Sequence, residues 1–238
     1  MIGVLGGMGP LATADFFAKV ISATPATADN DHVPLLIQSD PRIASRPAAI
    51  LGGARSPLPE LLVGRDRLIR AGAMALAMPC NTAHFWYDDL VKDCRVPFLS
   101  IVDASVNELS QRADSGSTIG IIATRATLAA QIFDPALIRA GYSVMLPDEI
   151  VLTELVLPGI EFVKAGEALR GGQLIEQAVQ CLVNNGAQAV ILACTETPLA
   201  LDATQSQLRA QCVDSTAALA RACVAWWQSQ QASSAINE

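Results

Sequence analysis

The sequence is poor in several residue types, and each shortage excludes a class of protein. Of its 238 residues only 16% are charged, 5% are aromatic and two are histidines. Two histidines cannot form a histidine-rich metal centre, so we expect no resident metal. A net charge of −7 disfavours a nucleic-acid partner, because phosphates need a basic face. No apolar run approaches the roughly 20 residues of a membrane-spanning helix, so we expect no membrane segment.

The cysteine pattern indicates free thiols rather than a disulfide framework. Six cysteines are spread along the chain and none are spaced as CxxC. We therefore expect a reduced, cytoplasmic protein. Hydrophobic residues make up 51% of the chain, enough for a substantial core. The length fits one large α/β domain or two small ones.

An internal repeat is the first informative pattern. Residues 2–5 read IGVL and residues 119–122 read IGII, while residues 71–82 resemble residues 185–195. The strands in these segments are continuous apolar runs, which is typical of parallel strands buried on both faces. Helical periodicity fills the intervals at 61–71, 169–184 and 214–228.

These patterns predict an α/β fold with two similar, doubly wound lobes. We expect parallel sheets, a pseudo-twofold relation between the lobes and an active site in the cleft between them. The first lobe is predicted to comprise residues 1–101 and 213–238, with the C-terminal helix packed back on it. Residues 102–212 are predicted to form the second lobe.

Polar residues stand where four of the predicted strands end, which is where such sheets bind ligands. They are a glycine turn at 6–10, Cys80 with the following Asn-Thr, residues 124–127, and Cys194 with the following Thr-Glu. Cys80 and Cys194 occupy equivalent places in the repeat, so we expect their thiols to approach one cleft from opposite sides. A helix N-terminus stabilises a thiolate there. The other four cysteines are interpreted as small buried hydrophobes.

Two other interpretations of these motifs remain open at this stage. Residues 7–12 read GMGPLA and fit a dinucleotide-binding fingerprint, with Asp29 and Asp31 as candidates for a ribose contact. The simpler interpretation is a turn whose bare backbone N–H groups receive a carboxylate. Cys80 and His84 are four residues apart, which is compatible with a Cys–His hydrolase. Neither interpretation gives Cys194 a role, and His84 is otherwise expected only to orient local groups.

Three segments carry a resemblance to a known family. They are GVLGGMGPLAT at 3–13, PCNTAH at 79–84 and ACTETP at 193–198. In this order and spacing they resemble the aspartate/glutamate racemase family, most closely its aspartate racemase branch, over nearly the whole chain. The resemblance implies two α/β lobes, a homodimer, and cofactor-independent inversion at the α-carbon of an acidic amino acid by two bases.

By the same resemblance, Cys80 and Cys194 match the catalytic thiols. Arg46 and Lys164 match basic positions associated with dicarboxylic substrates, although the segment before Arg46 lacks an acidic residue often found there. The glycine turn and the resemblance together give our predicted substrate-binding residues: Gly7, Met8, Gly9, Arg46, Asn81, Thr82, Thr124, Lys164, Thr195 and Glu196.

The chemistry of the chain is compatible with such a reaction. A pyridoxal phosphate racemase needs a Schiff-base lysine, and none of the three lysines stands in a recognisable site, so we expect no cofactor. One thiolate can remove the α-proton while the other thiol delivers a proton to the opposite face. We predict an aspartate racemase, with glutamate as a second substrate. The alternatives are a related isomerase or hydantoin racemase acting on another small acid, and a non-catalytic binder of acidic amino acids.

Overall fold

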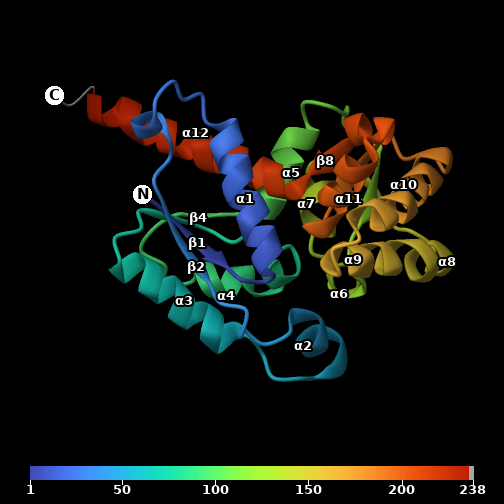
Figure 1. Cartoon of the computed structure of the whole chain (residues 1–238), viewed down its shortest axis with the longest axis horizontal. Helices are drawn as coiled ribbons and strands as arrows, with labels where there is room; N and C mark the ends of the chain where they lie inside the picture. Colours follow the sequence, from blue (N-terminus) through green and yellow to red (C-terminus); the bar gives the residue numbers. More distant parts are fainter. Residues whose placement is uncertain (236–238) are drawn as a thin grey trace.

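Two parallel β-sheets of four strands each form the centre of the protein (Figure 1), which is described by a computed structural model for residues 1–235. The strand orders are β2-β1-β3-β4 and β6-β5-β7-β8, so both sheets share one topology. The predicted α/β fold with parallel sheets is confirmed. Residues 236–238 of the predicted first lobe lie outside the described residues. The strands are β1 Ile2–Gly6, β2 Leu35–Ser39, β3 Ala75–Ala77, β4 Phe98–Leu99, β5 Thr118–Ile122, β6 Ser143–Met145, β7 Ala189–Leu192 and β8 Cys212–Asp214.

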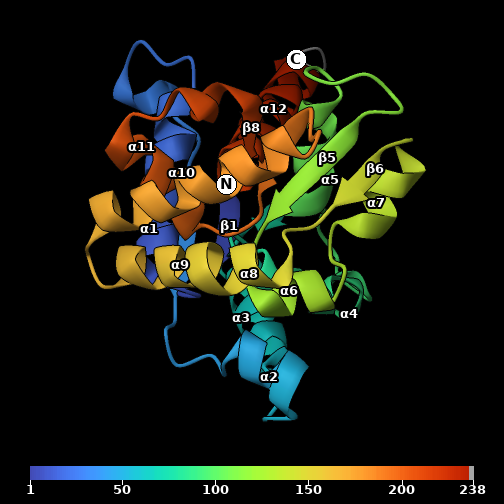
Figure 2. The same ribbon diagram turned by 90° about the vertical axis from the view of Figure 1, so that its right-hand side faces the viewer.

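Helices follow nearly every strand and surround both sheets (Figure 2). In the first half they are α1 Pro10–Ala23, η1 Asp29–Asp31, α2 Arg46–Gly52, α3 Leu58–Arg70, η2 Thr82–Trp86, α4 Tyr87–Val91 and α5 Ile101–Leu109. In the second half they are α6 Arg125–Ala129, α7 Asp134–Arg139, α8 Glu149–Val151, the π-helix η3 Leu152–Val156, α9 Leu157–Lys164, α10 Ala168–Asn184, α11 Glu196–Thr204, η4 Gln207–Gln211 and α12 Ser215–Ala235. No helix in this described part of the chain has the length and apolarity needed to cross a membrane.

The repeated IGVL and IGII segments form β1 and β5, the second strand of each sheet. Both strands pack closely against a helix at their glycine. A Cβ on Gly3 would lie 3.1 Å from the Cβ of Leu68 in α3, and one on Gly120 would lie 3.0 Å from a methyl group of Leu182 in α10. The repeat therefore preserves a site of close helix–sheet packing.

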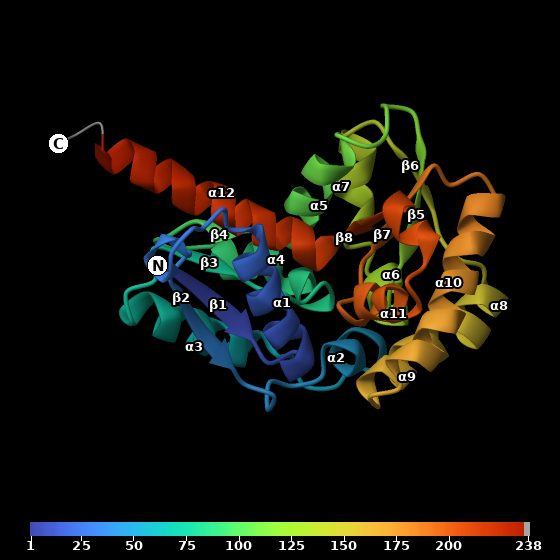
Figure 3. The same cartoon turned by 45° about the horizontal axis from the view of Figure 1, so that its top comes forward.

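Helix α12 begins directly after β8 of the second sheet and lies against α1 and α5 beside the first sheet (Figure 3). Its buried face, which includes Leu219 and Val224, shares one hydrophobic cluster with Phe16 and Val20 of α1. The C-terminal helix is thus the element by which the chain returns from the second sheet to the first.

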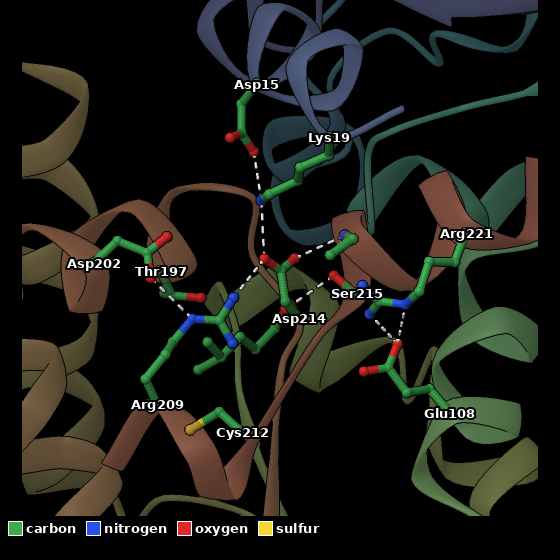
Figure 4. A network of polar contacts seen from close by, with 12 residues as sticks. Asp15, Lys19, Glu108, Thr197, Asp202, Arg209, Cys212, Asp214, Ser215 and Arg221 are labelled. Carbon is green, nitrogen blue, oxygen red and sulfur yellow. Dashed lines mark hydrogen bonds and ion pairs between the residues drawn. The ribbon is translucent and has the colours of Figure 1, made fainter. Parts of the chain in front are cut away.

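The side chain of Asp214 holds the start of α12 in place, where the chain leaves the second sheet (Figure 4). Its side chain is only 2% exposed, and its Oδ2 lies 2.9 Å from both Lys19 Nζ of α1 and Arg209 Nη2 of η4. Its Oδ1 accepts a hydrogen bond from the N–H of Ala217 and so caps α12. A buried carboxylate is tolerated only when it is paired, and here the partners come from both halves of the protein. Further along α12, Arg221 forms an ion pair with Glu108 of α5.

The Lys19–Asp214 pair predicts a specific loss of stability. Lys19→Met leaves Asp214 with Arg209 and the helix cap only, and it also removes the ion pair of Lys19 with Asp15 at 2.6 Å. We expect the free energy of unfolding to fall by about 2 kcal/mol, less than the roughly 3–5 kcal/mol lost when an isolated buried pair is broken. Urea unfolding at pH 7 measures the change. The exposed Lys92→Met is the matched control and should unfold like the wild type; equal midpoints for both variants would contradict the prediction.

Candidate active site

A cavity of about 410 Å³ lies between the two halves and is lined from both. It is bordered by the residues that follow β1, β3, β5 and β7, as expected for the carboxyl ends of parallel strands. Every site residue predicted from the sequence borders the cavity except Gly7. The structure thus brings Cys80 and Cys194, from one sheet each, to a single cavity.

Gly7 lies behind the cavity and shapes the turn that borders it. Its φ of +93° suits glycine, and a Cβ there would lie 2.3 Å from the backbone nitrogen of Asp40. Its N–H donates to Thr13 Oγ1 at 2.8 Å, and that hydroxyl donates to the carbonyl of Gly9 at 3.1 Å. The Gly7 N–H is therefore occupied, and the border itself is formed by Met8 and Gly9 with Pro10, the first residue of α1.

The surroundings of Cys80 favour a thiolate more than those of Cys194 do. Burial raises the pKa of the Cys80 thiol, while the Arg46 guanidinium and the N–H of Ala83 act in the opposite direction. Burial also raises the pKa of Cys194, and the Glu196 carboxylate raises it further, so that it lies well above its usual value. The charge that acts most strongly on Cys80 is the Arg46 cation, whereas the one that acts most strongly on Cys194 is the Glu196 carboxylate.

Glu196 is held in place by two donors. The Cys194 thiol donates to Glu196 Oε2 at 3.0 Å, and the Thr195 hydroxyl donates to the same oxygen at 2.9 Å. The Thr197 hydroxyl donates to the carbonyl of Cys194 at 2.8 Å, which fixes the backbone of this turn. The geometry keeps the proton on Cys194 and leaves the lone pairs of the Thr195 oxygen available.

His84 supports Cys80 without touching its thiol. Because its Nε2 accepts the N–H of Ile101 at 3.1 Å, the ring proton is on Nδ1, which donates to the Cys80 carbonyl at 2.9 Å. Burial lowers the pKa of His84 to about 4, so the ring is neutral at pH 7. This arrangement contradicts the Cys–His hydrolase interpretation and agrees with an orienting role.

Two polar side chains at the cavity, the buried Asn81 and the partly buried Arg46, have unused hydrogen-bonding capacity. Asn81 is 3% exposed, and neither its Oδ1 nor its Nδ2 has a partner within residues 1–235. Arg46 begins α2, and its Nη1 donates to the carbonyls of Ile43 and Ala44 at 3.0 and 2.9 Å. Its buried Nε has no partner in the same described part. Such groups need a ligand or water, because an unsatisfied buried donor is costly.

Lys164 is the second cation of the cavity. It ends α9, its side chain is 46% exposed, and its Nζ lies 2.9 Å from Glu161. Its charge also opposes the rise in the pKa of Cys194. Lys164 is thus the more exposed of the two cations, while Arg46 is partly buried.

Five residues that border the cavity were not among the predicted site residues, namely Pro10, Leu11, Ser45, Pro47 and Ala193. Ser45 and Pro47 flank Arg46 at the start of α2, and the Ser45 side chain caps that helix. The motif S-R-P at 45–47, a helix cap followed by proline near the first helical position, predicts that a helix begins at Arg46. This was the sequence signal that could have placed Ser45 and Pro47 beside Arg46.

The structure also bears on cofactors. Asp29 and Asp31, the candidates for a ribose contact, do not border the cavity. The Asp31 carboxylate instead accepts the N–H groups of Thr27 and Ala28, so neither candidate is placed for the ribose contact that the dinucleotide interpretation requires. Among the residues described, no three His, Cys, Asp or Glu side chains gather as metal ligands would.

Comparison with known proteins gives concordant matches. The sequence model of the family described as Asp/Glu/Hydantoin racemase matches residues 5–223. The broad specificity amino-acid racemase RacX of Bacillus subtilis is 29% identical over 97% of this chain and 100% of its own length.

Solved structures agree with this match. The aspartate racemase of Picrophilus torridus is 30% identical with a TM-score of 0.82, covering 94% of this chain and 92% of that one. An aspartate racemase homologue from Pyrococcus horikoshii is 25% identical with a TM-score of 0.76, covering 94% and 97%. The chain therefore belongs to the Asp/Glu/hydantoin racemase family and is a racemase, an enzyme of the isomerase class.

Proposed function

We propose that the chain racemises aspartate, with glutamate as a second substrate, without a cofactor and with Cys80 and Cys194 as the two bases. The supporting observation is that two buried thiols, from corresponding turns of two similar sheets, border one cavity with two cations. An amino acid placed between them has one thiol on each side of its α-carbon. The resemblance also leads us to propose a homodimer and a cytoplasmic location.

The proton transfers follow from the charges beside each thiol. The Cys80 thiolate, favoured by Arg46, takes the α-proton, and the electron pair of the C–H bond passes to the α-carbon and its carboxylate. The Cys194 thiol, kept protonated by Glu196, then gives its proton to the opposite face. Cys80 is now the thiol and Cys194 the thiolate, which is the state required by the other enantiomer.

The remaining groups of the cavity distinguish the α-ammonium end of the substrate from its side-chain carboxylate. The Thr195 oxygen, whose hydrogen is already donated to Glu196, offers lone pairs suited to the α-ammonium group. The free Nε of Arg46 and the Nζ of Lys164 suit the side-chain carboxylate. The Bacillus relative is named for broad specificity and the Picrophilus relative for aspartate. The paired cations favour the acidic substrate.

The first prediction concerns the two thiols. Wild-type protein with reductant and chelator, and without added cofactor, should exchange the α-proton of L-aspartate in deuterated buffer and lose optical rotation. Cys80→Ala and Cys194→Ala should each reduce racemisation by about 10²- to 10⁴-fold, because each removes a general acid–base group. Proton NMR and polarimetry follow both reactions.

Cys181→Ala, which removes a thiol of α10 outside the cavity, is the matched control and should retain full activity. Full racemisation by either cavity variant would remove the two-base mechanism. Absence of exchange with both aspartate and glutamate in the wild type would refute the proposed substrates.

The second prediction concerns the unequal thiols. Iodoacetamide should alkylate Cys80 faster than Cys194 at pH 8, because the carboxylate beside Cys194 opposes its ionisation. Glu196→Gln removes this charge, lowers the pKa of Cys194 and should make its alkylation several-fold faster. Peptide mass spectrometry over time gives both rates. The exposed Glu154→Gln should leave them unchanged; an unaltered Cys194 rate in Glu196→Gln would contradict the assignment.

The third prediction concerns specificity. Lys164→Met removes one charge-assisted hydrogen bond and should weaken binding of L-aspartate about tenfold. Binding of L-asparagine, which has the same shape but an uncharged side chain, should change little. Calorimetry on both ligands measures the difference, and Lys164→Arg should keep the preference for aspartate. Equal loss for the two ligands would show that Lys164 does not recognise the side-chain carboxylate.

A further inference from the structure

Three threonine hydroxyls meet where the two halves of the protein touch beside the cavity. Thr82 Oγ1 lies 2.8 Å from Thr127 Oγ1, which lies 3.0 Å from Thr124 Oγ1. Thr82 and Thr124 are 3.4 Å apart through the same atoms. Thr82 and Thr124 border the cavity, whereas Thr127 does not and is only 2% exposed. Thr127 is therefore the inner member of the group.

The local sequence fixes this arrangement. Thr82 begins η2 after β3 of the first sheet, and Thr124 caps α6 after β5 of the second. Thr127 is the third residue of α6, and its N–H donates to Thr124 Oγ1 at 3.3 Å. This capping contact holds the two side chains of α6 together, so that Thr82 reaches both across the junction.

Each of the three threonine hydroxyls can donate one hydrogen. Three hydroxyls carry three hydrogens, and within residues 1–235 their oxygens form no hydrogen bond with any other side chain. The two short contacts, through Thr127, use one hydrogen each. If Thr127 accepted both, its own hydrogen would be buried without a partner, which is costly. Thr127 therefore accepts from one neighbour and donates to the other.

One hydrogen is left over, and it belongs to a residue of the cavity. If Thr82 donates to Thr127 and Thr127 to Thr124, the spare hydrogen is on Thr124. If Thr124 donates to Thr127 and Thr127 to Thr82, the spare hydrogen is on Thr82. Its only partner in the described protein is the 3.4 Å contact between these two residues, which is beyond the usual range for an O–H donor. The spare hydrogen is available to an anion in the cavity.

We propose that Thr127 is a positioning residue that joins Thr82 and Thr124 into one hydroxyl chain and directs a single hydrogen bond to the α-carboxylate of the substrate. This inference rests on the proposed racemase function. Each hydroxyl of the chain polarises the next, which strengthens the terminal donor. The same contacts tie the two halves together at the substrate.

Thr127→Val tests the proposal, because it removes the inner hydroxyl while retaining a β-branched side chain of similar size. The α-carboxylate is bound both before and during proton transfer, so the loss should appear in KM. We expect KM for L-aspartate to rise about tenfold, with kcat changed less than about threefold. Thr127→Ser, which restores the hydroxyl, should restore KM. A merely structural role would lower kcat and thermal stability together and leave KM unchanged.

Thr216→Val is the matched control. Thr216 is also a fully buried threonine, but its hydroxyl has no partner among the described residues, so its removal should not affect KM. A second test uses Thr82→Val. If Thr127 acts through the hydroxyl chain, the KM of the double variant Thr82→Val/Thr127→Val should be no higher than that of Thr82→Val alone.

The outcomes separate the two proposals. An active wild type with an unchanged KM in Thr127→Val, or with additive effects in the double variant, overturns the role of Thr127 and leaves the racemase intact. A wild type that neither exchanges the α-proton of aspartate or glutamate nor racemises them overturns the proposed function, and the role of Thr127 falls with it.

Discussion

The buried carboxylate of Asp214 is the interaction on which the arrangement of the two halves depends. It receives Lys19 from the first helix, Arg209 from the second half and the first turn of α12. The next residue, Ser215, donates its hydroxyl to the carbonyl of Leu192 at 2.9 Å. Leu192 ends β7, two residues before Cys194. One charged side chain thus ties α1, the returning helix and the strand of a cavity thiol to a common point.

The two halves share a topology but carry different charges at the cavity. Equivalent strands deliver Cys80 and Cys194, yet Arg46 stands near the first and Glu196 near the second. A symmetric scaffold therefore places two similar thiols in dissimilar electrostatic fields. Burial raises the pKa of both thiols, but the difference in neighbouring charge makes Cys80 the easier of the two to ionise.

Much of this could be predicted from the sequence, because residues at the ends of apolar strands must meet at one edge of a parallel sheet. That rule gives both cysteines and Thr124. It does not give contacts that depend on side-chain direction: the Gly7 N–H is taken by Thr13, and Thr127 is an inner partner rather than a residue of the cavity. The division into residues 1–101 with 213–238, and 102–212, stays a prediction.

The path of α12 has a consequence for how the protein is made. The apolar face of α1 that contains Phe16 and Val20 is completed by a helix that follows the entire second half in the chain. During synthesis on the ribosome, this face of α1 stays uncovered until more than a hundred residues after the first half have been added. The cluster between Leu5 and Phe98 can pack earlier, but this face of α1 is completed last, although nascent chains usually fold their N-terminal unit first. The nascent first half is left with an uncovered apolar face, the kind of surface that chaperones bind.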